Sequence, residues 1–132
     1  MRGLSADAAA RLERRHLTTL IRRLAAATAA RAAEWQVRDP DVYSWSSVEG
    51  SISVGSRDGD PPYELAIYNG RGERVDELAS ELVRGDQPAP WNDDLLELYR
   101  LARRSALRAD DVIEALIAAL PTGDRAAAVD PR

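Results

Sequence analysis

The chain of 132 residues contains no cysteine and only one histidine, His16. The absence of cysteine excludes disulfides, thiolate metal ligands and cysteine nucleophiles together, and a single histidine excludes the common multi-histidine metal sites. Gly70-Arg71-Gly72 lacks the third glycine of a dinucleotide-binding fingerprint. We therefore expect no catalytic residue, no bound metal and no cofactor, and the sequence favours a protein that is not an enzyme.

Long apolar runs are also missing. No stretch approaches the roughly 20 apolar residues of a membrane-spanning helix. Residues 1–16 hold too many arginines for the apolar core of a secretory signal. We expect a soluble, cytoplasmic protein that has no membrane partner.

Lysine and phenylalanine are absent, so all 18 basic residues are arginine. Alanine and arginine codons are rich in G and C, and the composition indicates a GC-rich bacterial genome. Residues 1–38 hold eight arginines against three acids, a net charge of +5, whereas residues 39–132 carry −9. Such asymmetry can indicate a nucleic-acid or protein partner. It can equally indicate self-association, or have no functional meaning.

The N-terminal quarter of the chain reads as a helix. Residues 5–35 contain no glycine or proline and are rich in alanine, the strongest helix former. At 100° per residue, their large apolar side chains gather in an arc of ~100°. The pattern predicts one amphipathic helix over residues 5–35, with Trp35 beside the arc.

After a turn at residues 38–41, the apolar period changes to two, as in strands. Tyr43 and Trp45 alternate with serines, and both are expected in the core. Similar runs at 51–55 and 63–68 follow tight-turn residues, and residues 73–78 suit a short edge strand. The sequence predicts an antiparallel meander of three or four strands with one apolar face.

The C-terminal part is again periodic after a connecting loop at 80–92. Its apolar residues recur at spacings of four and three. They are Leu95, Tyr99, Ala102, Ala106, Ala109, Ile113, Leu116 and Leu120. This spacing predicts either one helix of about 28 residues or two helices with a break near 108–110, where Asp111 and Glu114 match a capping box.

These segments together predict an α+β fold with a long N-terminal helix, a three- to four-stranded antiparallel meander and a C-terminal helix, continuous or broken near 108–110, packed on one face of the sheet. Residues 1–123 are expected to form a single domain, and residues 124–132 a flexible tail.

Two charges, Glu13 and Arg31, lie inside the apolar arc of the first helix, equally far from Arg22 along the chain. A charge there is costly unless it is paired. An antiparallel pairing of two copies would place Glu13 of one opposite Arg31 of the other, in a two-fold interface. The alternative is that both helix ends project beyond the core. The predicted homodimer interface is Glu13, Leu17, Leu20, Ile21, Leu24 and Arg31.

The opposite side of the same helix carries a cluster of arginines. These are Arg11, Arg14, Arg15, Arg22 and Arg23. Arginine binds phosphate in a bidentate manner, so the cluster is a candidate nucleic-acid surface, and a solvated helix face is the alternative. The net charge of −4 and the absence of a recognisable nucleic-acid-binding motif favour the solvated face.

Two further features have simple structural interpretations. His16, at the flank of the apolar arc, is expected to be a partly buried structural residue. Asp58-Gly59-Asp60 is typical of a turn, and a calcium loop would need a longer run of oxygen ligands.

The sequence thus favours a non-enzymatic protein-interaction or regulatory module, either a homo-oligomer or a binder of another protein. A nucleic-acid-binding regulator that uses the arginine cluster is the alternative, and a small enzyme is a third class.

Overall fold

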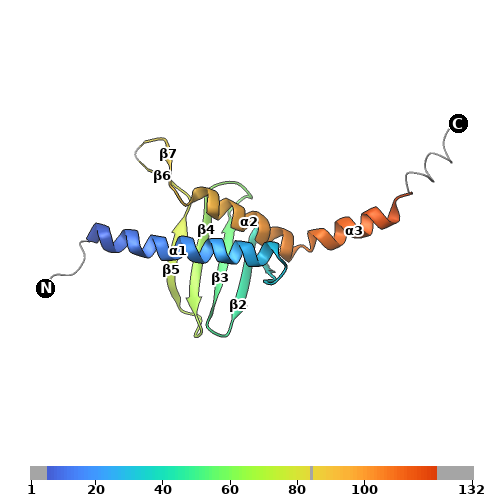
Figure 1. Ribbon diagram of the computed structural model, residues 1–132, viewed down its shortest axis with the longest axis horizontal. Helices are drawn as coiled ribbons and strands as arrows, with labels where there is room; N and C mark the ends of the chain where they lie inside the picture. The colour runs from blue at the N-terminus through green and yellow to red at the C-terminus, as the bar shows by residue number, and fades with distance from the viewer. Residues whose placement is uncertain (1–5, 84, 122–132) are drawn as a thin grey trace.

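A computed structural model describes the backbone of residues 6–83 and 85–121, and the side chains of residues 14–82 and 85–121. Helix α1 (Ala6–Ala29) leads into a five-stranded antiparallel sheet, and α2 (Asn92–Ala106) and α3 (Ala109–Ala119) follow (Figure 1). The predicted α+β class is confirmed, with one strand more than expected. The expected tail at 124–132 lies outside the described residues.

The sheet is a simple meander in which each strand pairs with the next along the chain. Its strands are β1 (Gln36–Asp39), β2 (Val42–Ser47), β3 (Gly50–Ser56), β4 (Tyr63–Asn69) and β5 (Arg74–Ala79). A separate hairpin of β6 (Leu82–Val83) and β7 (Gln87–Pro88) lies in the segment expected to be a loop. Strand β1 is the addition to the prediction: it begins directly after the expected end of the first helix at Trp35 and overlaps the expected turn at residues 38–41.

The strand register confirms that the sheet has one apolar face. Tyr43 pairs with Val54, which pairs with Leu65 on β4, and all three are buried. Because side chains alternate between the faces of a strand, Ser44 and Ser46 of β2 lie on the other face. The apolar face is the one that the helices cover.

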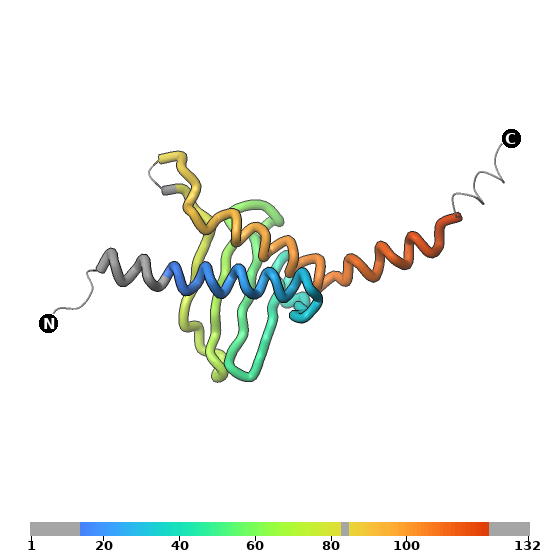
Figure 2. Tube along the Cα trace, in the orientation of Figure 1, coloured from blue at the N-terminus to red at the C-terminus, as the bar shows by residue number. Residues whose placement is uncertain are grey.

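Helices α1 and α2 lie side by side across that face, as Figure 2 shows. They enclose one core with the sheet. Leu95, Leu98 and Ala102 of α2 are fully buried, and Ile21 of α1 is 1% exposed. Both helices therefore have the covering role expected of them.

Helix α1 ends at Ala29, six residues before the predicted end. Arg31 adopts a left-handed conformation (φ 63°), and the N–H groups of Ala32 and Ala33 both donate to the Ala27 carbonyl. This geometry closes a helix C-terminus without glycine. It turns the chain so that Trp35 enters the core, 4% exposed, which offsets the cost of the unusual backbone.

The C-terminal segment is two helices, as in the second of the two predicted alternatives. Arg108 takes a left-handed conformation (φ 56°, ψ 45°) between Ala106 and Ala109. Helix α3 consequently leaves the direction of α2 and projects away from the sheet (Figure 1). The expectation that the whole C-terminal segment covers the sheet is wrong for α3.

Candidate interaction surface

The apolar arc of α1, predicted to pair with a second copy, faces the chain's own core. Leu17, Ile21 and Leu24 are 8%, 1% and 5% exposed, and Leu20 packs against the core from its edge. The apolar side chains are therefore covered within the chain. They are not available as the centre of an α1–α1 interface.

The two charges of that predicted interface do not form a site on α1. Arg31 lies beyond the end of the helix and pairs with acids of α3 in the same chain. The side chain of Glu13 lies outside the described residues. The symmetry seen in the sequence therefore has no counterpart in the described part of the structure.

The arginine cluster on the outer side of α1 is partly engaged. The Arg14 guanidinium lies 5.6 Å from the ring centre of Trp91, and Arg22 Nε donates to Asp94 Oδ2 at 3.0 Å. Arg15 and Arg23 are exposed, and the side chain of Arg11 lies outside the described residues. The engaged arginines weaken the case for a continuous phosphate-binding surface.

Of the interpretations given to His16 and to Asp58-Gly59-Asp60, only the second agrees with the structure. His16 is exposed rather than partly buried, so that interpretation is wrong. The Asp58 segment is a turn, in which Ser56 Oγ accepts the Gly59 N–H at 2.9 Å and Asp58 Oδ1 accepts the Asp60 N–H at 3.0 Å. Among the described residues no group of three or more His, Cys, Asp or Glu side chains is placed to hold a metal ion.

Helix α3 carries the most conspicuous unexplained surface. Five of the ten large apolar side chains that stand exposed among the described residues lie between Val112 and Leu120. They are Val112 (51% exposed), Ile113 (44%), Leu116 (59%), Ile117 (64%) and Leu120 (65%). Isolated exposed apolar residues are ordinary, whereas a contiguous set marks an interaction site.

These side chains share one side of the helix. At 100° per residue, Ile113, Leu116 and Leu120 fall within about 60° of one another, with Val112 and Ile117 on the flanks. On the same projection Asp111 and Glu114 lie on the other side of the helix, and Asp110 lies at the boundary beside Ile117. Helix α3 is therefore amphipathic, and none of its apolar residues is buried against the part of the chain that the structure describes.

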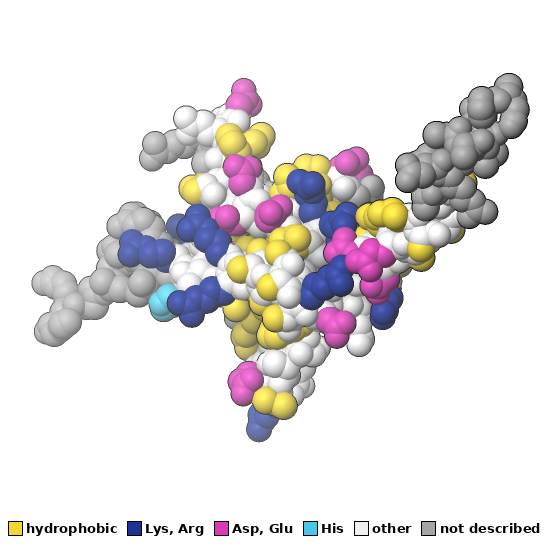
Figure 3. All heavy atoms as spheres, turned by 45° about the vertical axis from the view of Figure 1, so that its right-hand side comes forward, with side chains coloured by type: hydrophobic (Ala, Val, Ile, Leu, Met, Phe, Trp, Pro, Cys, Tyr) yellow, Lys and Arg dark blue, Asp and Glu magenta, His cyan; other side chains and the backbone are white. Residues whose placement is uncertain are grey.

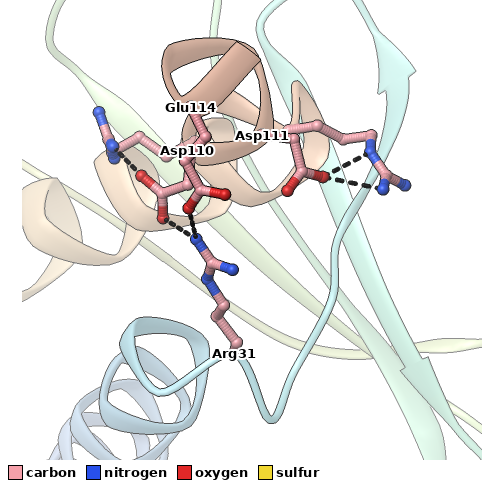
Figure 4. Close-up of polar contacts among 6 residues, drawn as sticks. Arg31, Asp110, Asp111 and Glu114 are labelled. Atoms are coloured by element: carbon pink, nitrogen blue, oxygen red, sulfur yellow. Dashed lines mark hydrogen bonds and ion pairs between the residues drawn. The ribbon is translucent and has the colours of Figure 1, made fainter. Parts of the chain in front are cut away.

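The acidic side of α3 is held to the body by arginines from two other segments (Figure 4). Arg31 contacts Asp110 at 3.1 Å and Glu114 at 3.5 Å, and Arg104 of α2 also pairs with Asp110. Arg108 pairs with Asp111 at 2.8 Å. We call these six residues the α3 anchor. Figure 3 shows this charged cluster, with hydrophobic side chains farther along α3.

The charges of the anchor stabilise one another. The Arg31 guanidinium, and after it that of Arg104, holds the pKa of the Asp110 carboxyl below its ordinary value of 3.8. The same pairing with Asp110 raises the pKa of Arg31. Single exposed ion pairs contribute little to stability, but networks with a shared member fix geometry better. The anchor thus orients α3 more than it stabilises the fold.

A shallow groove of about 890 Å³ lies beside the anchor. Trp35 and Ala33 line it on one side and the anchor residues Arg104 and Asp110 on another. It lies on the charged side of α3, away from the apolar side. The groove and the apolar side of α3 are therefore two separate surfaces.

We expect Arg31→Gln to loosen α3 without unfolding the domain, because it removes the guanidinium that pairs, from the turn after α1, with Asp110 and Glu114 of α3. Amide hydrogen exchange should become faster in α3 and stay unchanged in α2. The matched control is Arg74→Gln, which removes an exposed ion pair to Glu77 within β5. Equal exchange of α3 in the Arg31 variant and the wild-type protein would contradict the anchoring role.

Acid should act on the wild-type anchor in the same way. A carboxyl whose pKa is lowered in the folded protein contributes stability above its unfolded pKa, and this contribution is lost as the pH falls through the folded value. For Asp110 that window lies below 3.8. The difference in α3 exchange between wild type and Arg31→Gln should therefore shrink as the pH falls below 3.8.

No family model, no curated protein and no solved structure matches this chain. In the described residues no helix has both the length and the apolar character needed to cross a membrane.

Proposed function

We propose that this protein is a non-enzymatic protein-interaction module, and that its binding element is α3 rather than the α1 face indicated by the sequence pattern. The observation that carries the proposal is the set of five large apolar side chains exposed on one side of a short helix. A partner that covered this surface would gain about 25 cal/mol of favourable free energy for each Å² of apolar area removed from water.

The orientation of α3 supports the same conclusion. The anchor uses the charged side of the helix, so the apolar side is left facing away from the body. A helix presented in this way suits recognition through anchors at i, i+3, i+4 and i+7, as in helix-in-groove binding. Ile113, Leu116, Ile117 and Leu120 have this spacing.

Photo-crosslinking in cells tests the proposal. A photoreactive phenylalanine analogue replaces Leu116 in one variant and Arg100, an exposed residue of α2, in the control. We expect light-dependent adducts with protein from position 116 and few from position 100. If position 116 gives no protein adduct of any kind, α3 is not a binding element and the proposal fails.

A further inference from the structure

We infer that the partner of α3 is α3 of a second copy of this chain, packed antiparallel across a two-fold axis. This inference rests on the proposed function and names the partner for the same surface. Most soluble oligomers are homo-oligomers with two-fold symmetry, in which one surface meets itself. The surface must then be self-complementary, and α3 satisfies this condition.

The spacing of the apolar residues permits pairing with itself. An antiparallel pair centred between Glu114 and Ala115 places Ile113 opposite Leu116 of the second copy, and Val112 opposite Ile117. It also places Ala109 opposite Leu120. Every large apolar residue of the helix then meets an apolar residue, and a small one lies opposite the terminal leucine.

The charges of α3 favour the antiparallel direction over the parallel one. All three acids lie between Asp110 and Glu114, and residues 115–120 carry no charge. An antiparallel pair puts the acidic half of each helix beside the neutral half of the other, whereas a parallel pair would put the acids of both copies side by side. Antiparallel helix dipoles also attract each other.

The charges also argue against other occupants. Helices that bind membrane surfaces carry lysine or arginine on their polar side, and the polar side of α3 carries only acids. Those acids are engaged by arginines of the same chain, so they are not left to recognise a basic partner. The part of α3 that remains free is neutral and apolar, like the surface that we infer it binds.

The size of the surface sets the expected affinity. Two helices of this length bury on the order of 1,000 Å² together, at the lower limit for a specific interface. We therefore expect a reversible dimer with a dissociation constant in the micromolar range. Leu17, Ile21 and Leu24 have low exposure, so residues 14–29 of α1, whose side chains the structure describes, offer no comparable apolar surface.

Sedimentation velocity of the full chain from about 1 to 500 µM tests the inference, because self-association depends on concentration. We expect wild-type protein to pass from monomer to dimer over this range. Leu116→Glu should raise the dissociation constant about 100-fold, since two-fold symmetry introduces each substitution twice. Val48→Glu is the control, because Val48 is 89% exposed in the β2–β3 turn.

A wild-type monomer at every concentration, or equal association of Leu116→Glu and the wild type, would overturn the inference. Circular dichroism of each variant checks that the fold is intact. Adducts from position 116 with other proteins alone would also overturn it, while leaving the proposed function standing. The absence of all adducts from position 116 would contradict both the α3 homodimer and the proposed interaction function.

The direction of pairing has its own measurement. The chain is free of cysteine, so spin labels can be attached at single cysteines introduced by Ala115→Cys or Ala119→Cys. Antiparallel helices should give a clearly longer distance between the two labels for position 119 than for position 115, since each position away from the centre adds about 3 Å along the axis. Equal distances would indicate parallel helices and contradict the arrangement.

Discussion

Replacing Trp35 by alanine is expected to lower the free energy of unfolding by about 3–5 kcal/mol, the usual cost of removing a large buried aromatic side chain. Trp35 is 4% exposed. Its Nε1–H donates to Thr28 Oγ1 of α1 at 2.9 Å, and its backbone N–H donates to Ser105 Oγ of α2 at 2.9 Å. One residue thus joins the end of α1, the start of the sheet and the end of α2.

Urea unfolding followed by circular dichroism measures this loss. Trp45→Ala is the matched control, because Trp45 packs at the edge of the core and is only partly buried. We expect its cost to be less than half that of Trp35→Ala. Equal losses in the free energy of unfolding would mean that the contacts of Trp35 stabilise the fold no more than those of Trp45.

The same residue shows where sequence reasoning reached its limit. The alanine-rich stretch gave no reason to end the helix before Trp35, since it contains no glycine or proline. The helix ends because Arg31 adopts a left-handed backbone, which costs roughly 1–2 kcal/mol for a residue with a Cβ. Burial of Trp35 and Ala33 offsets that cost, and such a tertiary gain leaves no local signal.

Strand β1 was missed for the same reason. Its four residues, Gln36–Asp39, are all exposed, so they have no apolar alternation to detect. They join the sheet by pairing with β2, where Gln36 lies opposite Ser44. The strands with alternating apolar residues, in contrast, could be placed from the sequence, because burial of one face imposes a period of two.

The candidate site was missed because periodicity does not identify what covers an apolar side. The spacing of four and three runs from Leu95 to Leu120 without interruption, and it indicates an apolar seam throughout. The first half of the seam is core, whereas the second half is exposed. Asp111 and Glu114 indicated a helix start near this point, and α3 does begin there. The sequence pattern could not show that Asp110 and Glu114 pair with Arg31, beyond the end of α1, or that Asp110 also pairs with Arg104 of α2.

A buried leucine of α2 and an exposed leucine of α3 should therefore differ widely in the cost of truncation. Leu98 of α2 is 0% exposed and Leu116 of α3 is 59% exposed. We expect Leu98→Ala to lower the free energy of unfolding by about 3–4 kcal/mol, a large part of the 5–15 kcal/mol of a typical domain, because it leaves a cavity in the core.

Leu116→Ala removes the same atoms from a side chain that is mostly in water, and alanine is the better helix former. Its cost in the monomer should stay below about 0.5 kcal/mol. The measurement is urea unfolding at a protein concentration low enough for the monomer to dominate. If α3 pairs with a second copy, the free energies of unfolding of the wild type and Leu116→Ala should diverge as the protein concentration rises. Dimerisation stabilises only the chain that can dimerise. A loss of several kcal/mol for Leu116→Ala in dilute solution would instead show that α3 packs on its own domain, and the apolar side of α3 would no longer be a binding surface.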